Sequence, residues 1–179
     1  MVERQGNPVA VLSVIPDSSL GLPSDSIFPE KTAALRTSGR KASEISSFVV
    51  LDNSDESGIE IPLHLFKTVW LTARYIHGST DMIATAMSRH AAFYGHVLLF
   101  DELSRDERIS PKTGEKVRYG RLRLDTVCER YKSRFSNLSG NKNLYHFFND
   151  GTEMKIVDWI KREHKPMSKD DIKYFESKL

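Results

Sequence analysis

Apolar and polar residues alternate along the chain from Ile59 to Tyr75. This period of two is typical of a half-buried β-strand, because successive side chains of a strand point to opposite faces of the sheet. The pattern predicts a strand over residues 59–75. The apolar run Phe48–Leu51 would pair with it as a hairpin, joined by the polar loop 52–58. The apolar face of the predicted long strand consists of Ile59, Ile61, Leu63, Leu65, Val69, Leu71, Ala73 and Tyr75.

The rest of the chain predicts elements of both kinds. Thr80 is a candidate N-cap for a helix that ends at Tyr94, before Gly95. Gly120 indicates a bulge in a strand over Val117–Leu124. An α+β fold follows, with a small, mostly antiparallel sheet packed against a few helices. The other predicted elements are a strand at His96–Phe100, a helix at Thr126–Phe135, a strand or short helix at Leu144–Phe148, an amphipathic helix around Met154–Ile160 and a last helix from Ser168.

The first 45 residues hold four of the seven prolines and show no sustained periodicity. They predict a flexible Pro/Ser-rich arm over residues 1–45, followed by a globular domain over 46–179. One apolar segment lies between Pro8 and Pro16. It is either a sticky part of the arm or a strand that docks onto another subunit. The residues assigned to self-association are Val9, Val11, Leu12, Val14 and Ile15.

Composition adds limits on size and compartment. The 179 residues suit one domain of ordinary size, and Cys128 is the only cysteine, so an internal disulfide or a multi-thiolate zinc site cannot form. No apolar run reaches the roughly 18–20 residues needed to span a bilayer. Residues 1–7 do not resemble the start of a secretory signal. We therefore expect a protein of a reducing compartment that is neither secreted nor anchored by a transmembrane segment.

Motifs for catalysis or metal binding are not apparent in the sequence. The six histidines show no metal-ligand spacing, and there is no Gly-x-Ser-x-Gly motif or phosphate-binding glycine loop. Cys128 is expected to be a small buried residue, and Asp101 and Glu102 to belong to a solvated loop. These observations predict no metal, no cofactor and no enzymatic activity. A small enzyme would require histidines distant in sequence to converge in space.

Charge is distributed unevenly. Residues 1–58 hold five Lys/Arg and eight Asp/Glu, a net of −3, whereas residues 59–179 hold twenty-one and sixteen, a net of +5. The basic residues concentrate on one predicted strand and the helix after it. Such a face suits nucleic-acid phosphates or an anionic surface, although an ordinary solvated basic face is equally compatible. The residues assigned to this basic face are Arg118, Arg121, Arg123, Arg130, Lys132 and Arg134.

The sequence LTARYIHGSTDMIATAMSRH at residues 71–90 resembles rhabdovirus matrix proteins, with a strand, a Ser/Thr-Asp helix start and an Ala-rich helix. The later strands and the preceding arm are also similar. The arm is not lysine-rich and no late-budding motif is present, which favours a plant-infecting, cytorhabdovirus-like member.

The resemblance implies a non-enzymatic structural protein without a small-molecule substrate, located in the virion and the host cytoplasm or nucleus. Its implied partners are itself, the nucleoprotein–RNA complex and an anionic membrane surface, which it would bridge. The alternative hypothesis is a phage or bacterial accessory protein that binds the nucleic-acid backbone through the same basic face.

Overall fold

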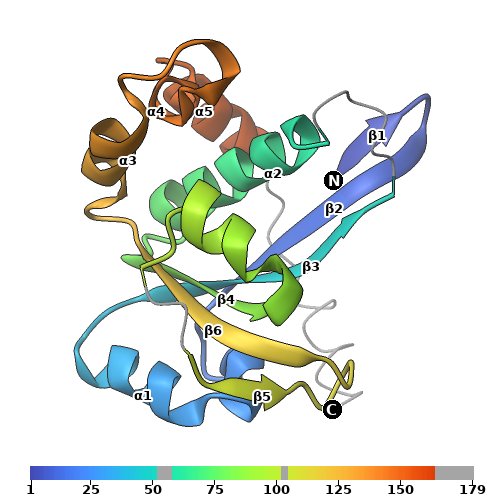
Figure 1. The fold of residues 1–179 in the computed structure, drawn as a ribbon, viewed down its shortest axis with the longest axis vertical. Helices are drawn as coiled ribbons and strands as arrows, with labels where there is room; N and C mark the ends of the chain where they lie inside the picture. The colour runs from blue at the N-terminus through green and yellow to red at the C-terminus, as the bar shows by residue number, and fades with distance from the viewer. Residues whose placement is uncertain (52–57, 102–104, 164–179) are drawn as a thin grey trace.

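The computed structural model describes residues 1–51, 58–101 and 105–163, and it shows a six-stranded sheet with helices on both faces (Figure 1). The strand order is β1-β2-β3-β4-β6-β5, and every neighbouring pair is antiparallel except β3 and β4, which are parallel. The predicted mixed fold with a mostly antiparallel sheet is confirmed. The strands are β1 (Val2–Arg4), β2 (Asn7–Pro16), β3 (Ala42–Val50), β4 (Asp81–Met87), β5 (Glu107–Ile109) and β6 (Lys116–Arg123).

Two hydrophobic cores lie on opposite faces of this sheet. The larger core packs the sheet against α2 and the C-terminal helices, and the smaller one packs it against η1 and α1 (Figure 1). Successive residues of β4 alternate between the two cores, as a central strand requires. The helices are η1 (Pro23–Ser26), α1 (Pro29–Thr37), α2 (Glu60–Leu71), α3 (Val127–Phe135), η5 (Gly140–Lys142), α4 (Leu144–Phe148) and α5 (Glu153–Glu163).

The predicted long strand at 59–75 is wrong, because this segment forms α2 and a π-helical turn, η2 (Thr72–Ile76). The helix packs between the sheet and α5, so nearly all of its sides are buried and no clear helical period shows in the sequence. Even Lys67 is buried, where its Nζ donates to the Phe147 carbonyl at 2.7 Å and pairs with Asp150 at 2.9 Å. Pro62 is tolerated because it lies in the first helical turn.

The predicted helix at 80–94 is also wrong, because residues 81–87 form the central strand β4. Both faces of β4 are covered, which removes the alternation that marks a half-buried strand. Two short turns follow, η3 (Ser88–His90) and the π-helical η4 (Phe93–Val97), in place of the predicted strand at 96–100. The register between β4 and β6 runs without a shift past Gly120, so the predicted bulge there is absent.

Residues 1–45 belong to the fold and do not form a separate arm. β2 pairs with β3 of its own chain over Ala10–Pro16, and β1 pairs with its first residues. The boundary predicted at residue 45 falls inside β3. Local sequence hid this arrangement because the strand depends on pairing with distant residues. The predicted strand at Phe48–Leu51 and the elements at β6, α3 and α5 are confirmed, and residues 144–148 take the helical alternative, α4.

Two sequence expectations fall on segments outside the described residues, namely the loop 52–58 for the most part and the helix from Ser168. Within the described part of the chain, none of the helices has the length and apolar character needed to cross a membrane.

Candidate active site

The two parallel strands β3 and β4 separate in the middle of the sheet. Residue pairing between them begins at Ala42 and Asp81 and stops at Ile45 and Ala84, although both strands continue. Beyond these residues the main-chain groups that face the gap are not paired between the two strands. A sheet opened in this way offers hydrogen-bond donors and acceptors to a ligand.

A β-bulge in β3 accounts for the separation. The register of β3 against β2 shifts by one residue, so that Ser47 and Phe48 together face Leu12. Ser47 has φ of +52°, a left-handed conformation that is uncommon outside glycine. A bulge bends its strand and increases the local twist. It therefore directs β3 away from β4 immediately after their last pair, while Phe48 stays packed against the larger core.

A cavity of about 630 Å³ occupies this opening. Its walls come from both strands, from η1, from the turn at Ser110–Thr113 between β5 and β6, and from the residues after β4. Volumes of this size are typical of small-molecule sites. The topology thus brings together four stretches that are far apart in the sequence, around residues 23–27, 44–49, 85–94 and 110–117.

Glu44 is the buried acid of this cavity, with 2% of its surface exposed. Burial raises the pKa of its carboxyl group, and hydrogen bonds from Ser24 and Thr85 oppose that shift in part. The Ser24 amide donates to Oε2 at 2.8 Å and the Thr85 hydroxyl to Oε1 at 3.1 Å. The carboxyl group is therefore held in one orientation at the start of the gap.

The cavity rim is basic. Arg89, His90 and Lys112 line it. Arg89 donates through Nε to His90 Nε2 at 3.1 Å and pairs through Nη1 with Glu115 at 3.0 Å. An anionic group on a ligand would find charge-assisted donors here.

The family model named N-acyl amino acid synthase FeeM matches residues 1–122. This chain belongs to the FeeM family. A solved structure, that of FeeM, an N-acyl amino acid synthase from uncultured soil microbes, is similar in fold, with a TM-score of 0.58 and 21% identity over 68% of this chain. The match covers 64% of that protein, so this chain spans less than two thirds of it. Among proteins with curated descriptions, none matches.

Membership of the FeeM family overturns several predictions made from the sequence. The chain is not a rhabdovirus matrix protein, and the prediction that it is not an enzyme is wrong, because the family is one of synthases. The same finding contradicts the viral partners and the absence of a small-molecule substrate. A virion location has no support, and neither has the nucleic-acid-binding alternative. The resemblance relied on residues 71–90, where strand and helix had been interchanged.

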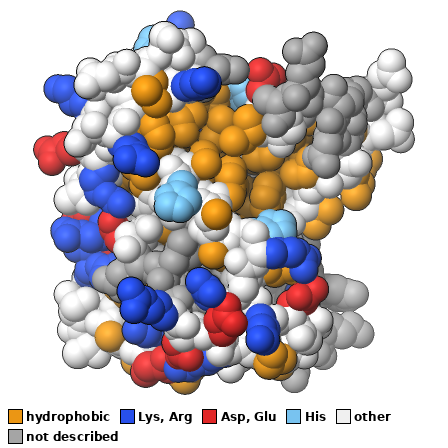
Figure 2. All heavy atoms as spheres, in the orientation of Figure 1, with side chains coloured by type: hydrophobic (Ala, Val, Ile, Leu, Met, Phe, Trp, Pro, Cys, Tyr) orange, Lys and Arg blue, Asp and Glu red, His pale blue; other side chains and the backbone are white. Residues whose placement is uncertain are grey.

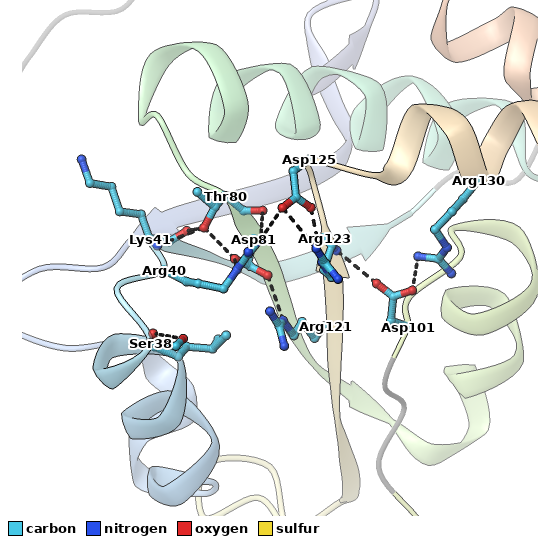
Figure 3. A network of polar contacts seen from close by, with 11 residues as sticks. Ser38, Arg40, Lys41, Thr80, Asp81, Asp101, Arg121, Arg123, Asp125 and Arg130 are labelled. Atoms are coloured by element: carbon cyan, nitrogen blue, oxygen red, sulfur yellow. Dashed lines mark hydrogen bonds and ion pairs between the residues drawn. The ribbon is translucent and has the colours of Figure 1, made fainter.

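The basic residues predicted as a binding face are mostly in ion pairs within the chain. Arg121 binds the fully buried Asp81 at 2.8 Å, and Arg123 contacts Asp125 at 3.3 Å (Figure 3). Arg118 binds Glu107 at 2.6 Å. Arg130 pairs with Asp101. Lys132 and Arg134 lie exposed on α3. The first four charges are therefore largely balanced by carboxylates, so a function of this face in binding an anionic partner stays a prediction.

The residues predicted for self-association lie along β2 instead of on an arm. Leu12 is buried in the larger core, and Val9, Val11, Val14 and Ile15 are half-buried. Their contacts with β3 explain the apolar character of the segment within one chain. A role in self-association stays a prediction.

Sequence reasoning missed Glu44, Thr85 and Arg89. Glu44 was assigned to the arm, and Thr85 and Arg89 fell within the helix predicted over residues 80–94, where the structure has β4 and η3. One signal was available, because Glu44 stands beside Ile45 and only four residues before the strand predicted at Phe48–Leu51. Within the described residues, no cluster of three His, Cys, Asp or Glu side chains is placed to hold a metal ion.

Proposed function

We propose that this protein transfers an acyl group to the amino group of an amino acid and so forms an N-acyl amino acid. Membership of the FeeM family supports the type of reaction. The observation that carries the proposal is the position of Glu44, a buried acid that lines a cavity where two parallel strands separate. This arrangement supplies a base, main-chain hydrogen-bonding groups and enclosed space at one point.

The chemistry requires an activated acyl donor, such as a thioester. The amine nitrogen attacks the acyl carbon and forms a tetrahedral intermediate. The carbon–nitrogen bond replaces the carbon–sulfur bond as the thiolate leaves. Starting from the ammonium form, the nitrogen loses two protons, of which one goes to solvent and one to the departing thiolate, and no oxidant or reductant is needed. Catalysis therefore depends on removing a proton from the amine and on stabilising the oxyanion.

Glu44 is assigned as the general base. An amino acid is mostly an ammonium ion at neutral pH, and the nitrogen must lose protons before and during attack. A carboxyl group whose pKa is raised by burial is a stronger base than an exposed one. Its two hydrogen bonds, from Ser24 and Thr85, fix its direction and so reduce the reorganisation that proton transfer requires.

The gap between the strands is assigned to the acyl carbonyl. Main-chain N–H groups on β3 and β4 beyond Ile45 and Ala84 have no partner across the gap. Such donors stabilise a developing oxyanion in a site that excludes bulk water. The basic rim is assigned to the amino-acid carboxylate, with Arg89 and Lys112 as its donors.

The experiment is a screen of acyl thioesters of several chain lengths against each of the twenty amino acids, with products identified by mass spectrometry. The proposal predicts an N-acyl amino acid for at least one pair. Glu44→Gln keeps the shape of the side chain and an oxygen acceptor but removes the base. We expect it to reduce kcat/KM by about 100-fold or more.

Glu129→Gln is the matched control, because Glu129 lies exposed on α3, away from the cavity. It should retain wild-type activity. Burial disfavours the charged form of Glu44, so the uncharged glutamine is not expected to lower the melting temperature at neutral pH. Absence of product from every pair, with a folded wild-type protein, would refute the proposed function.

A further inference from the structure

The cavity extends through the sheet, because its walls include residues from both faces. Glu44 and Thr85 lie on the side of η1, where the Ser24 amide holds Glu44. Ile45 and Ala86 belong to the core on the side of α2. Neighbouring residues of one strand point to opposite faces, so a single cavity lined by both sets must run through the opening between β3 and β4.

Tyr94 lies at the α2 side of this cavity. It is 6% exposed, and burial raises the pKa of its hydroxyl to about 12. Its ring contacts Phe66 with centroids 5.9 Å apart and Phe100 at 5.2 Å, both edge to face. Tyr94 belongs to the π-helical turn η4, and Leu99 shortly after it has φ of +55°. Irregular backbone of this kind is frequent at functional sites.

A second, very small cavity is lined in part by the same rings, Phe66 and Phe100. Its volume is about 10 Å³, and its lining is apolar and aromatic, including Phe66, Trp70, Phe100 and Phe148. Phe66 and Phe100 thus both contact Tyr94 and line the second cavity. Figure 2 shows that hydrophobic side chains also gather on the surface in the region of α2.

We propose that Tyr94, at the α2 side of the opening between β3 and β4, limits the length of the alkyl chain that this protein accepts. This inference rests on the proposed function. The polar reaction then takes place on the η1 side, while the alkyl chain ends against aromatic rings. Removing the Tyr94 ring vacates space beside Phe66 and Phe100, which also line the second cavity, and so admits longer chains.

The length limit follows from the energetics of burial. Each methylene that moves from water into an apolar cavity improves binding by about fourfold. A chain that meets the Tyr94 ring gains nothing from further methylenes, because they stay in water or force the packed rings apart. The affinity of the wild type for a series of chains should therefore rise with length and then stop rising at one value.

The test uses free fatty acids of increasing length as probes, with binding measured by calorimetry. In Tyr94→Ala the rise should continue for several methylenes beyond the wild-type limit, at about fourfold for each. Tyr94→Phe keeps the ring and should keep the limit. Tyr75→Ala is the matched control, since Tyr75 is 41% exposed and lines neither cavity.

Ala86→Leu tests the inference in the opposite direction, by shortening the chain that is accepted. Its result is informative even if Tyr94→Ala does not fold. The larger side chain narrows the α2 side of the cavity, so the limit should move to shorter chains. An unchanged limit in both folded variants, or no binding of fatty acids by the wild type, would overturn the inference. These outcomes are distinct from failure of the proposed function, which is absence of N-acyl amino acid product.

Discussion

Thr85 on β4 donates a hydrogen bond of 3.1 Å to Glu44 on β3, immediately beyond the last residue pair that joins the two strands. This bond links the geometry of the open sheet to the chemistry of the carboxyl group. It holds Glu44 toward β4 and favours its charged form. Burial raises the pKa of Glu44, and the hydrogen bond from Thr85 lowers it in part.

Thr85→Val removes the hydroxyl and keeps the side-chain shape. With one hydrogen bond to the carboxylate lost, we expect the pKa of Glu44 to rise further. Acyl transfer by an unprotonated base increases as pH rises through that pKa, so the rising limb of the kcat/KM–pH profile should move to higher pH. Profiles of wild type and variant measure the shift. An unchanged profile, or a shift to lower pH, would contradict the assignment of Glu44 as the base.

Arg89→Gln tests recognition of the amino-acid carboxylate. The cationic rim would lose a charge-assisted hydrogen bond, so KM for the amino acid should rise by about tenfold, with little change in kcat. Lys155→Gln, at an exposed position of α5, serves as the control and should leave KM unaltered. A fall in kcat without a change in KM would show that Arg89 acts in the chemical step instead.

The buried Asp81 is the main polar anchor at the start of β4. Its carboxylate accepts from Arg121 at 2.8 Å, from the Thr80 hydroxyl at 2.6 Å and from Arg40 (Figure 3). Asp81→Asn leaves two arginines without their shared counter-charge, and the free energy of unfolding should fall by about 3 kcal/mol. Asp125→Asn, at a side chain that is 43% exposed, should cost less than about 1 kcal/mol. Urea unfolding measures both, and equal effects would contradict this account.

Asp25 secures η1, which carries the Ser24 amide that binds Glu44. Its hydrogen bonds with Arg36 lower the pKa of Asp25 from 3.8 to about 2. A lowered pKa stabilises the fold above the unfolded-state value, and that stability is lost as pH falls from about 4 to about 2. Asp25→Asn should therefore be less stable than wild type at pH 7, by about 1 kcal/mol given solvent screening.

The pH dependence of this difference in stability tests whether the charge of Asp25 is its cause. The difference between variant and wild type should shrink as the pH falls below about 4 and vanish only below the folded-state pKa of about 2. Thermal melts across this range show whether it does. A difference that is constant with pH would mean that Asp25 stabilises η1 through shape alone and not through its charge.

Helices with one exposed face and strands with ordinary burial were predictable from the sequence. The helix α3 keeps Val127, Tyr131 and Phe135 on one buried side, and β6 lies where the apolar residues predicted a strand. The central elements were not predictable in this way, because α2 and β4 are covered on nearly all sides. The sequence of α2 therefore lacks a clear helical period, and that of β4 lacks the alternation of a half-buried strand. Length was the unused signal, since seventeen residues is long for a strand and ordinary for a helix.

The site depends on features that local sequence does not report. Glu44, Thr85 and Arg89 meet only because β3 and β4 are parallel neighbours joined through α2. Likewise, the cavity depends on a bulge at Ser47, a residue with nothing distinctive in its sequence context. Basic residues, by contrast, were conspicuous in the sequence, but Arg118 and Arg121 bind carboxylates of the same chain.

The central claim is that Glu44 removes the proton from an amine that attacks an acyl group. The most direct measurement is kcat/KM for N-acyl amino acid formation by wild type and Glu44→Gln across a range of pH, with the best acyl thioester and amino acid. The account predicts a wild-type rate that rises with pH through a raised carboxyl pKa, and a variant that lacks this limb and is slower by about 100-fold or more. Equal rates with the same pH profile would contradict it.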